Sequence, residues 1–155
     1  MKPADFLDLL LPAALECQRI TKIPASFTLA QAALESAWGA SKLAQQGRNL
    51  FGVKADKSWK GETLDMLTTE VVRGKPIKVV AKWRVYPTWS ACILDRAKFF
   101  RDNLRYGKCW KETTGEGWAR AVQAAGYATD PDYADKLVRT MESRNLTRFD
   151  KVEAA

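Results

Sequence analysis

The 155-residue sequence contains no histidine. Without an imidazole, neither a Ser-His-Asp or Cys-His catalytic arrangement nor a histidine-ligated zinc site can form. A histidine proton shuttle is excluded for the same reason. Carboxylates, lysines, tyrosines and cysteines remain for acid–base chemistry, so any catalysis must depend on one of these groups.

Cysteine is also scarce. The three cysteines, Cys17, Cys92 and Cys109, are odd in number, far apart and without a CxxC pair. This pattern favours neither a disulfide framework nor a thiolate metal site. We interpret the three residues as small apolar residues of the core, and we expect no metal ion.

Long apolar segments are absent. Asp5, Asp8 and Glu16 interrupt the N-terminal apolar residues before a secretory signal or a membrane span can form. We therefore expect synthesis in a cytoplasm without a signal peptide, no stable membrane insertion, and export through another factor. The composition, 46% hydrophobic, is that of a globular protein. Its length fits one domain over residues 1–150, followed by a disordered tail at 151–155.

Acidic residues are too few to balance the basic ones, and the formal net charge is +7. This charge favours a polyanionic partner such as nucleic acid, an anionic membrane face or an acidic cell wall. The basic residues are scattered, and no helix-turn-helix or aromatic RNA-binding signature accompanies them. We therefore rank nucleic acid last and expect it not to be a partner.

The apolar residues recur with two different periods. A spacing of three and four predicts amphipathic helices, and it is found in Pro3–Arg19, Ser90–Leu104, Gly117–Ala125 and Asp132–Met141. Alternation with many Val, Thr and aromatic residues predicts strands at Thr63–Val72 and Ile77–Tyr86. The turn residues 73–76 lie between them, so we expect a β-hairpin, within a β-lobe at about 54–87 inserted in a mainly helical α+β fold.

A further helix is predicted to begin at Ser26 or Thr28 as its cap and to end near Trp38, where Gly39 provides a stop. Its expected apolar stripe consists of Phe27, Ala30, Leu34 and Trp38. The only charged residue between positions 23 and 41 is Glu35, at the edge of this stripe.

A half-buried Glu35 without a nearby cation should have a raised pKa, because burial disfavours the carboxylate. Such a group can donate a proton near neutral pH, as a general acid must when a glycosidic oxygen leaves. The alternative is that Glu35 points to solvent from the polar edge of an ordinary helix.

Three ordered motifs carry a resemblance to a known family. They are QAALESAWG at 31–39, NLFGVKA at 49–55 and AGYATDPDYA at 125–134. Together they resemble the glucosaminidase family of peptidoglycan hydrolases, which includes the wall-cutting domain of the flagellar rod protein, autolysins and phage lysins. The match covers roughly residues 26–146. A departure is Ala37, where many relatives carry Gly.

The resemblance implies a lysozyme-like fold, with a helical lobe and a small β-hairpin lobe on either side of a glycan cleft. It implies Glu35 as the general acid and Glu70, in the run Thr68-Thr69-Glu70, as a second carboxylate on the hairpin. Glu62 and Asp65 are alternatives for the second role. Tyr127 is implied to lie beside the acid, where its phenol would orient the substrate or stabilise charge.

Further candidates for substrate contact are Gln31, Asn49, Phe51, Gly52, Trp59, Trp83 and Tyr133. Gly52 permits close approach of backbone to sugar, whereas Phe51 is expected to pack under the cleft. Trp59 and Trp83 are expected either to stack on sugar rings or to pack in the β-lobe. Tyr133 is also expected to hold the loop and the helix after it.

The expected activity is endo-β-N-acetylglucosaminidase cleavage of the β-1,4 bond after N-acetylglucosamine in peptidoglycan. Two carboxylates can perform glycoside hydrolysis without a cofactor. The expected setting is a monomeric phage endolysin, made in the host cytoplasm, released by a holin-type partner and acting on the wall. The alternatives are a muramidase or lytic transglycosylase of the same fold, and a wall-binding module without turnover. The stereochemical course depends on the distance between the carboxylates and stays open.

Overall fold

The computed structural model describes residues 1–151. In chain order its elements are α1 (Pro3–Thr21), α2 (Ala25–Ser36), α3 (Lys42–Gly47), β1 (Thr63–Val72), β2 (Lys75–Arg84), α4 (Trp89–Asp102), η1 (Leu104–Lys111), α5 (Gly115–Ala124), α6 (Tyr133–Ser143) and η2 (Leu146–Lys151). The mainly helical α+β fold is confirmed. The short elements α3, η1 and η2 were not predicted. Of the expected disordered tail, Lys151 belongs to η2, and the other four positions lie outside the described residues.

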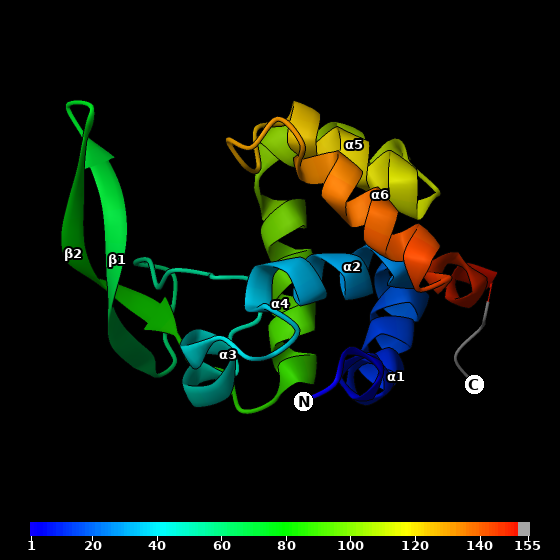
Figure 1. Cartoon of the computed structure of the whole chain (residues 1–155), viewed down its shortest axis with the longest axis horizontal. Coiled ribbons are helices and arrows are strands. Elements are labelled where there is room, and N and C mark those ends of the chain that lie inside the picture. The colour runs from blue at the N-terminus through cyan, green and yellow to red at the C-terminus, as the bar shows by residue number, and fades with distance from the viewer. Residues whose placement is uncertain (152–155) are drawn as a thin grey trace.

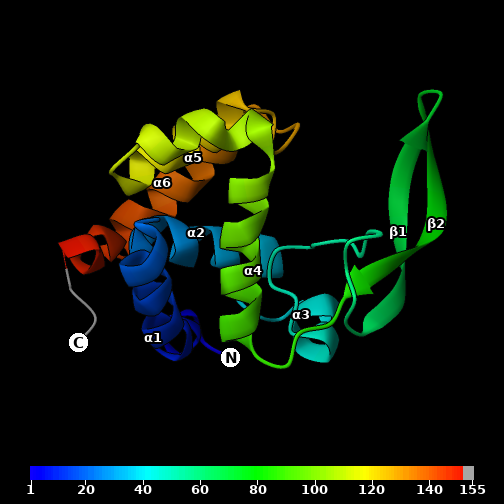
Figure 2. The ribbon, with the colours of Figure 1, turned by 180° about the vertical axis from the view of Figure 1, so that it is seen from behind.

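The hairpin forms a separate lobe beside the helices (Figures 1 and 2). Its two strands are antiparallel, with Leu64 opposite Trp83 and Glu70 opposite Ile77. The turn is shorter than predicted, because Arg73 and Gly74 alone connect the strands, with φ values of 52° and 77°. Positive φ at both central residues is the geometry of a type I′ turn, whose twist matches that of the strands.

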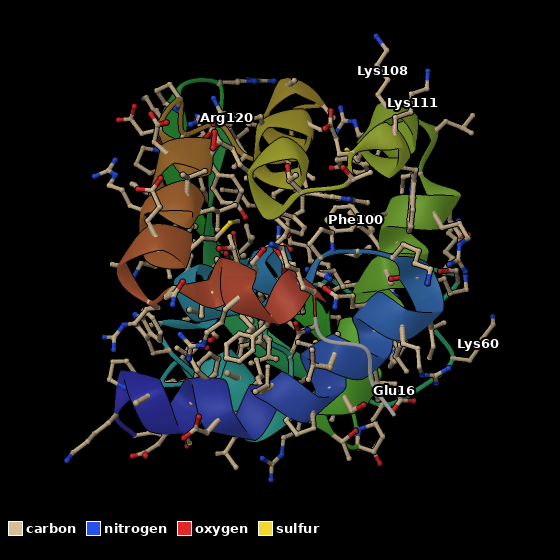
Figure 3. All side chains as sticks on the ribbon, turned by 90° about the vertical axis from the view of Figure 1, so that its right-hand side faces the viewer. Glu16, Lys60, Phe100, Lys108, Lys111 and Arg120 are labelled. Carbon is tan, nitrogen blue, oxygen red and sulfur yellow. The ribbon has the colours of Figure 1, made fainter. Side chains whose placement is uncertain are left out.

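The helical body is built around α2, which contacts α1, α5, α6 and η2. Nearly all of α2 is buried, including Phe27, Leu29 and Ala30. Phe100 of α4 points into the same core, whereas Lys108 and Lys111 of η1 extend outward (Figure 3). The C-terminal end of α2 points toward the hairpin (Figure 1), which brings Glu35, in the last turn, to the boundary of the two lobes.

The start of α2 differs from the prediction. The helix begins at Ala25, so Ser26 and Thr28 are buried inside its first turn and neither is the N-cap. The carboxylate of Asp150 takes that role, accepting hydrogen bonds from the Ser26 backbone N–H at 2.8 Å and from the Ser26 hydroxyl at 2.7 Å. A cap from 124 residues away leaves no local signal in the sequence.

The end of α2 also comes earlier than predicted. The helix ends at Ser36, and Ala37, Trp38 and Gly39 all have positive φ. The Ser36 hydroxyl accepts a hydrogen bond from the backbone N–H of Gly39 at 2.8 Å, which holds this turn. The predicted apolar stripe is wrong at Leu34, which is 39% exposed, and Trp38 lies beyond the last residue of the helix.

All three cysteines are buried and free, as predicted. Within residues 1–151, no helix is both long and apolar enough to cross a membrane. The same part of the chain contains no group of three or more Cys, Asp or Glu side chains placed to hold a metal ion.

Candidate active site

A pocket of about 480 Å³ lies between the helical body and the β-lobe. Glu35 lines it from the end of α2, and Arg96 lines it from α4. The opposite wall consists of the segment 51–54, Asp56 and Arg84 at the end of β2. The pocket therefore receives residues from both lobes, as expected of a glycan cleft.

Glu35 faces this pocket and is open to solvent on that side. Its Oε1 accepts a hydrogen bond from the Tyr133 hydroxyl at 2.8 Å. Desolvation by the surrounding protein raises the pKa of Glu35, and the hydrogen bond from Tyr133 lowers it by a smaller amount. The predicted direction of the pKa shift is confirmed. A carboxyl group in this state can give a proton to a leaving oxygen.

The tyrosine hydrogen-bonded to Glu35 is Tyr133. Tyr127, which the resemblance implies beside the acid, lines the same pocket as Glu35. Tyr133 is 4% exposed and is not among the residues that line the pocket. It therefore bonds to Glu35 without contacting a glycan in the pocket directly. Tyr127 lines the pocket and packs against Tyr133, with ring centroids 5.6 Å apart. Burial, with a smaller contribution from the nearby Glu35 carboxylate, raises the pKa of Tyr127 far above its usual value. Tyr127 therefore presents a neutral phenol.

Gln31 and Asn49 are fully buried, so they position other groups instead of meeting substrate directly. Gln31 donates a hydrogen bond from Nε2 to the Tyr133 hydroxyl at 3.0 Å. Asn49 donates from Nδ2 to the carbonyl oxygens of Val53 and Arg84, both at 2.9 Å. The latter two bonds join the pocket loop to the end of β2, so they hold together two parts of the same pocket wall.

Phe51 and Gly52 both line the pocket. Phe51 is 4% exposed and packs under the guanidinium of Arg96, whose Cζ lies 4.9 Å from the ring centroid, which agrees with its expected place under the cleft. Gly52 is exposed and has a φ of +66°, a conformation that favours glycine. Its backbone is therefore bare where a sugar would approach.

Both candidate tryptophans are half-buried in the β-lobe. Trp59 packs edge-on against Tyr86 and donates its indole N–H to the Glu62 carbonyl. Trp83 carries the Lys54 ammonium over its ring, 5.7 Å from the centroid. Neither ring is among the groups that line the pocket, so packing in the lobe is the role that these contacts support.

Three carboxylates of the β-lobe are placed differently. Glu70 forms an ion pair with Lys54, 2.9 Å between Nζ and Oε1, and Lys54 lines the pocket. Asp65 projects from the opposite face of the hairpin and pairs with Lys82. Asp56, which the sequence reasoning missed, lines the pocket itself. A hydrogen bond from Ser58, assisted by Arg84, lowers the pKa of Asp56, so this carboxylate stays ionised.

The sequence also provided no indication that Arg84 and Arg96 line the pocket. Arg84 joins the hairpin to α4 through Asp95, with Nη1 and Oδ2 2.8 Å apart, and it also pairs with Asp56. Arg96 lies fully buried beneath the pocket. A charged residue in an amphipathic helix is normally solvated. Only the position of Arg96 on the apolar face of the segment Ser90–Leu104 could have indicated that it is buried.

A helical body and a hairpin lobe that share a pocket with one protonatable carboxyl group define a lysozyme-like hydrolase fold. The model of the family described as "Glucosaminidase: Mannosyl-glycoprotein endo-beta-N-acetylglucosaminidase" matches residues 11–146, and the chain belongs to this glucosaminidase family.

Individual relatives agree with this assignment. Peptidoglycan hydrolase FlgJ of Salmonella typhimurium is 42% identical over 143 residues, which are 89% of this chain and 45% of FlgJ. Exo-glucosaminidase LytG of Bacillus subtilis is 42% identical over 132 residues, or 82% of this chain and 46% of LytG. This chain thus spans less than half the length of these relatives. The catalytic domain of the autolysin Auto from Listeria monocytogenes superposes with a TM-score of 0.86 at 32% identity, covering 96% of this chain and 87% of that domain.

Proposed function

We propose that this protein is an endo-β-N-acetylglucosaminidase that cleaves the β-1,4 bond after N-acetylglucosamine in peptidoglycan, with Glu35 as the general acid. The observation that carries the proposal is the placement of Glu35 at the edge of the pocket between the lobes, where desolvation by the surrounding protein raises its pKa. The protonated carboxyl group donates its proton to the glycosidic oxygen as the C–O bond breaks. The leaving sugar then departs as a neutral alcohol.

Glu70 is proposed as the second catalytic carboxylate. It lies on the hairpin opposite the helical body and is held by Lys54, a residue of the pocket wall. A negative group on that side would stabilise the positive charge that develops at the anomeric carbon, or activate water. Asp56 is the rival for this role, because it lines the pocket and stays ionised. Tyr127 is proposed to contact the substrate with its neutral phenol.

The proposed setting is a phage endolysin that acts as a monomer on the bacterial wall, after a holin-type partner releases it from the host cytoplasm. The net charge of +7 supports a wall substrate, since peptidoglycan carries peptide carboxylates and lies near anionic polymers. Attraction of this kind raises the encounter rate and weakens with salt.

The mode of cleavage needs a direct comparison, because LytG is named an exo-glucosaminidase. We would digest purified peptidoglycan, reduce the products with borohydride and identify the new ends by mass spectrometry over time. Long fragments with reduced N-acetylglucosamine ends at early times support the endo-glucosaminidase. Terminal saccharides released one by one would instead indicate an exo-enzyme.

The identity of the new ends also separates a glucosaminidase from enzymes that cut the neighbouring bond. Reduced or anhydro N-acetylmuramic ends would reassign the protein as a muramidase or a lytic transglycosylase.

Glu35→Gln is the control, because the amide keeps the shape of the side chain but cannot supply the proton. We expect kcat to fall by a factor of about 10²–10⁴, while the variant still sediments with peptidoglycan. Full turnover by the variant would contradict the role of Glu35, and sedimentation without cleavage by the wild type would indicate a wall-binding module.

A further inference from the structure

A continuous chain of hydrogen bonds connects a buried arginine to the proposed acid. Arg96 Nη1 donates to Gln31 Oε1 at 3.0 Å, and Gln31 Nε2 donates to the Tyr133 hydroxyl at 3.0 Å. The Tyr133 hydroxyl in turn donates to Glu35 Oε1 at 2.8 Å. Arg96, Gln31 and Tyr133 are at most 4% exposed, so bulk water does not compete for these bonds.

The direction of this chain follows from the chemistry of its first member. A guanidinium has five N–H donors and no acceptor, so the Gln31 amide must turn its oxygen toward Arg96. Its NH₂ group then faces Tyr133. The phenol oxygen accepts that hydrogen bond, and the phenol proton is directed to the remaining neighbour, Glu35. Every bond therefore has its donor on the Arg96 side and its acceptor on the Glu35 side.

Arg96 is held in place without an ion pair. Its other nitrogen, Nη2, donates to the Thr28 hydroxyl at 2.7 Å. Its Cζ lies 4.9 to 5.5 Å from the ring centroids of Phe27, Phe51 and Phe100, which stabilise the cation through their π-faces. Within residues 1–151, no carboxylate forms a salt bridge with Arg96, and its Nε has no hydrogen-bond partner. Burying a cation without a counter-ion costs free energy. The packing of the core does not by itself explain why an arginine stands at this position.

We propose that Arg96 is the positioning residue of the active site, acting through Gln31 and Tyr133. By fixing the direction of the chain, it commits Glu35 Oε1 to accepting the Tyr133 proton. Oε2 is then the oxygen that carries the proton delivered to the glycosidic bond. This inference rests on the proposed role of Glu35 as the acid, and it adds that a residue beneath the pocket decides which of the two oxygens is protonated.

The test replaces a donor by an acceptor in the row of hydrogen bonds while a polar side chain stays at position 31. In Gln31→Glu, both carboxylate oxygens accept, so one pairs with Arg96 and the other takes the Tyr133 proton away from Glu35. Glu35 loses its donor, and its pKa rises. In Gln31→Met, the matched control, two hydrogen bonds are lost, but the Tyr133 proton still has Glu35 as its acceptor. We therefore expect the basic limb of the kcat profile to move to higher pH in Gln31→Glu and to move much less in Gln31→Met.

A double-mutant comparison separates the effect of the Tyr133 proton on the kcat profile from the direct effect of the new charge at position 31. The shift caused by Gln31→Glu is measured in the wild-type background and in the Tyr133→Phe background, where no phenol proton is present. The proposal expects a larger shift with Tyr133 present. Equal shifts in the two backgrounds, or a Gln31→Met shift as large as that of Gln31→Glu, would overturn the directed chain, because charge or loosened packing would then suffice.

The role of Arg96 itself is tested with Arg96→Met. The control is Thr28→Val, which removes the other hydrogen-bond acceptor of Arg96 and keeps the hydrogen bonds that lead from Arg96 to Glu35. Arg96→Met frees the Gln31 amide to turn, so the limb should move to higher pH, whereas Thr28→Val should leave it in place. If Arg96→Met does not fold, the Gln31 and Tyr133 variants decide alone. Equal movement of the limb in both variants would contradict the proposal.

Titration of Glu35 by carboxyl ¹³C NMR provides a readout that needs no turnover. If the wild type cleaves no glycan but the Glu35 pKa rises in Tyr133→Phe and Gln31→Glu, the proposed function fails and the directed chain stands. If cleavage occurs but the NMR pKa of Glu35 is the same in all variants, the chain is overturned and the function stands.

Discussion

The carboxylate of Asp150 caps the N-terminus of α2 by accepting two hydrogen bonds from Ser26, 124 residues earlier in the sequence. The C-terminal segment thereby fixes one end of the helix whose other end carries Glu35. A negative charge at a helix N-terminus also interacts favourably with the helix dipole.

Replacing Asp150 should therefore destabilise the whole protein. We expect Asp150→Ala to lower the free energy of unfolding by about 1–2 kcal/mol, the usual cost of losing an N-cap, measured by urea denaturation. Asp132→Ala is the matched control, because Asp132 occupies the N-cap position of α6 without a side-chain cap bond. Equal losses in the two variants would show that the contact with Ser26 adds nothing.

Glu35→Gln should make the protein more stable above the Glu35 pKa. Because the folded-state pKa is raised, the stability that Glu35 contributes is fully present below its unfolded pKa and is lost as pH rises through the folded pKa. The amide avoids this loss. Urea denaturation at pH 4 and pH 8 should show a stability difference in favour of Glu35→Gln that is larger at pH 8.

The control for this comparison is Glu16→Gln, which makes the same charge change at an exposed position of α1. If Glu35→Gln and Glu16→Gln change stability equally between the two pH values, global charge explains the effect and the local environment of Glu35 does not.

Two carboxylates on opposite faces of the hairpin provide a matched activity test. Glu70 pairs with Lys54 next to the pocket, and Asp65 pairs with Lys82 on the other face. We expect Glu70→Gln to lower kcat by roughly 10²-fold or more, in the range of a lost acid–base group, and Asp65→Asn to leave it unchanged. Turnover of purified peptidoglycan is the measurement. An unchanged rate in Glu70→Gln, with a loss in Asp56→Asn, would transfer the second role to Asp56.

The thiols should be unreactive in the native protein. Cys17, Cys92 and Cys109 are all buried, which restricts access of a reagent. Burial also raises the pKa of Cys109 and raises that of Cys92 to about 12, so almost no Cys92 thiolate is present at pH 8. Ellman's reagent should modify none of the three residues until denaturant is added, and all three afterwards. Rapid modification of one thiol in the native state would show that its site opens locally.

Local sequence patterns predicted the elements that depend on neighbouring residues. The alternation in Thr63–Val72 and the spacing in Pro3–Arg19 were sufficient, since each pattern marks a face that must be buried. The predictions failed where a distant residue decides the outcome. The start of α2 depends on Asp150. For the same reason the sequence did not indicate the hydrogen bond from Tyr133 to Glu35, which depends on how α6 packs against α2.

Local patterns were enough to predict the longer helices, the hairpin and the resemblance to the family. Glu35 stood out as the candidate acid because it is the one charge in an otherwise uncharged stretch. The surroundings of that carboxyl group, in contrast, depend on the tertiary structure. The buried Arg96, the oxygen of Glu35 that Tyr133 occupies, and the entry of Asp56 into the pocket all depend on contacts between segments far apart in the chain. Composition and periodicity carry no information about such contacts, because they describe which side of an element is buried and not what it is buried against.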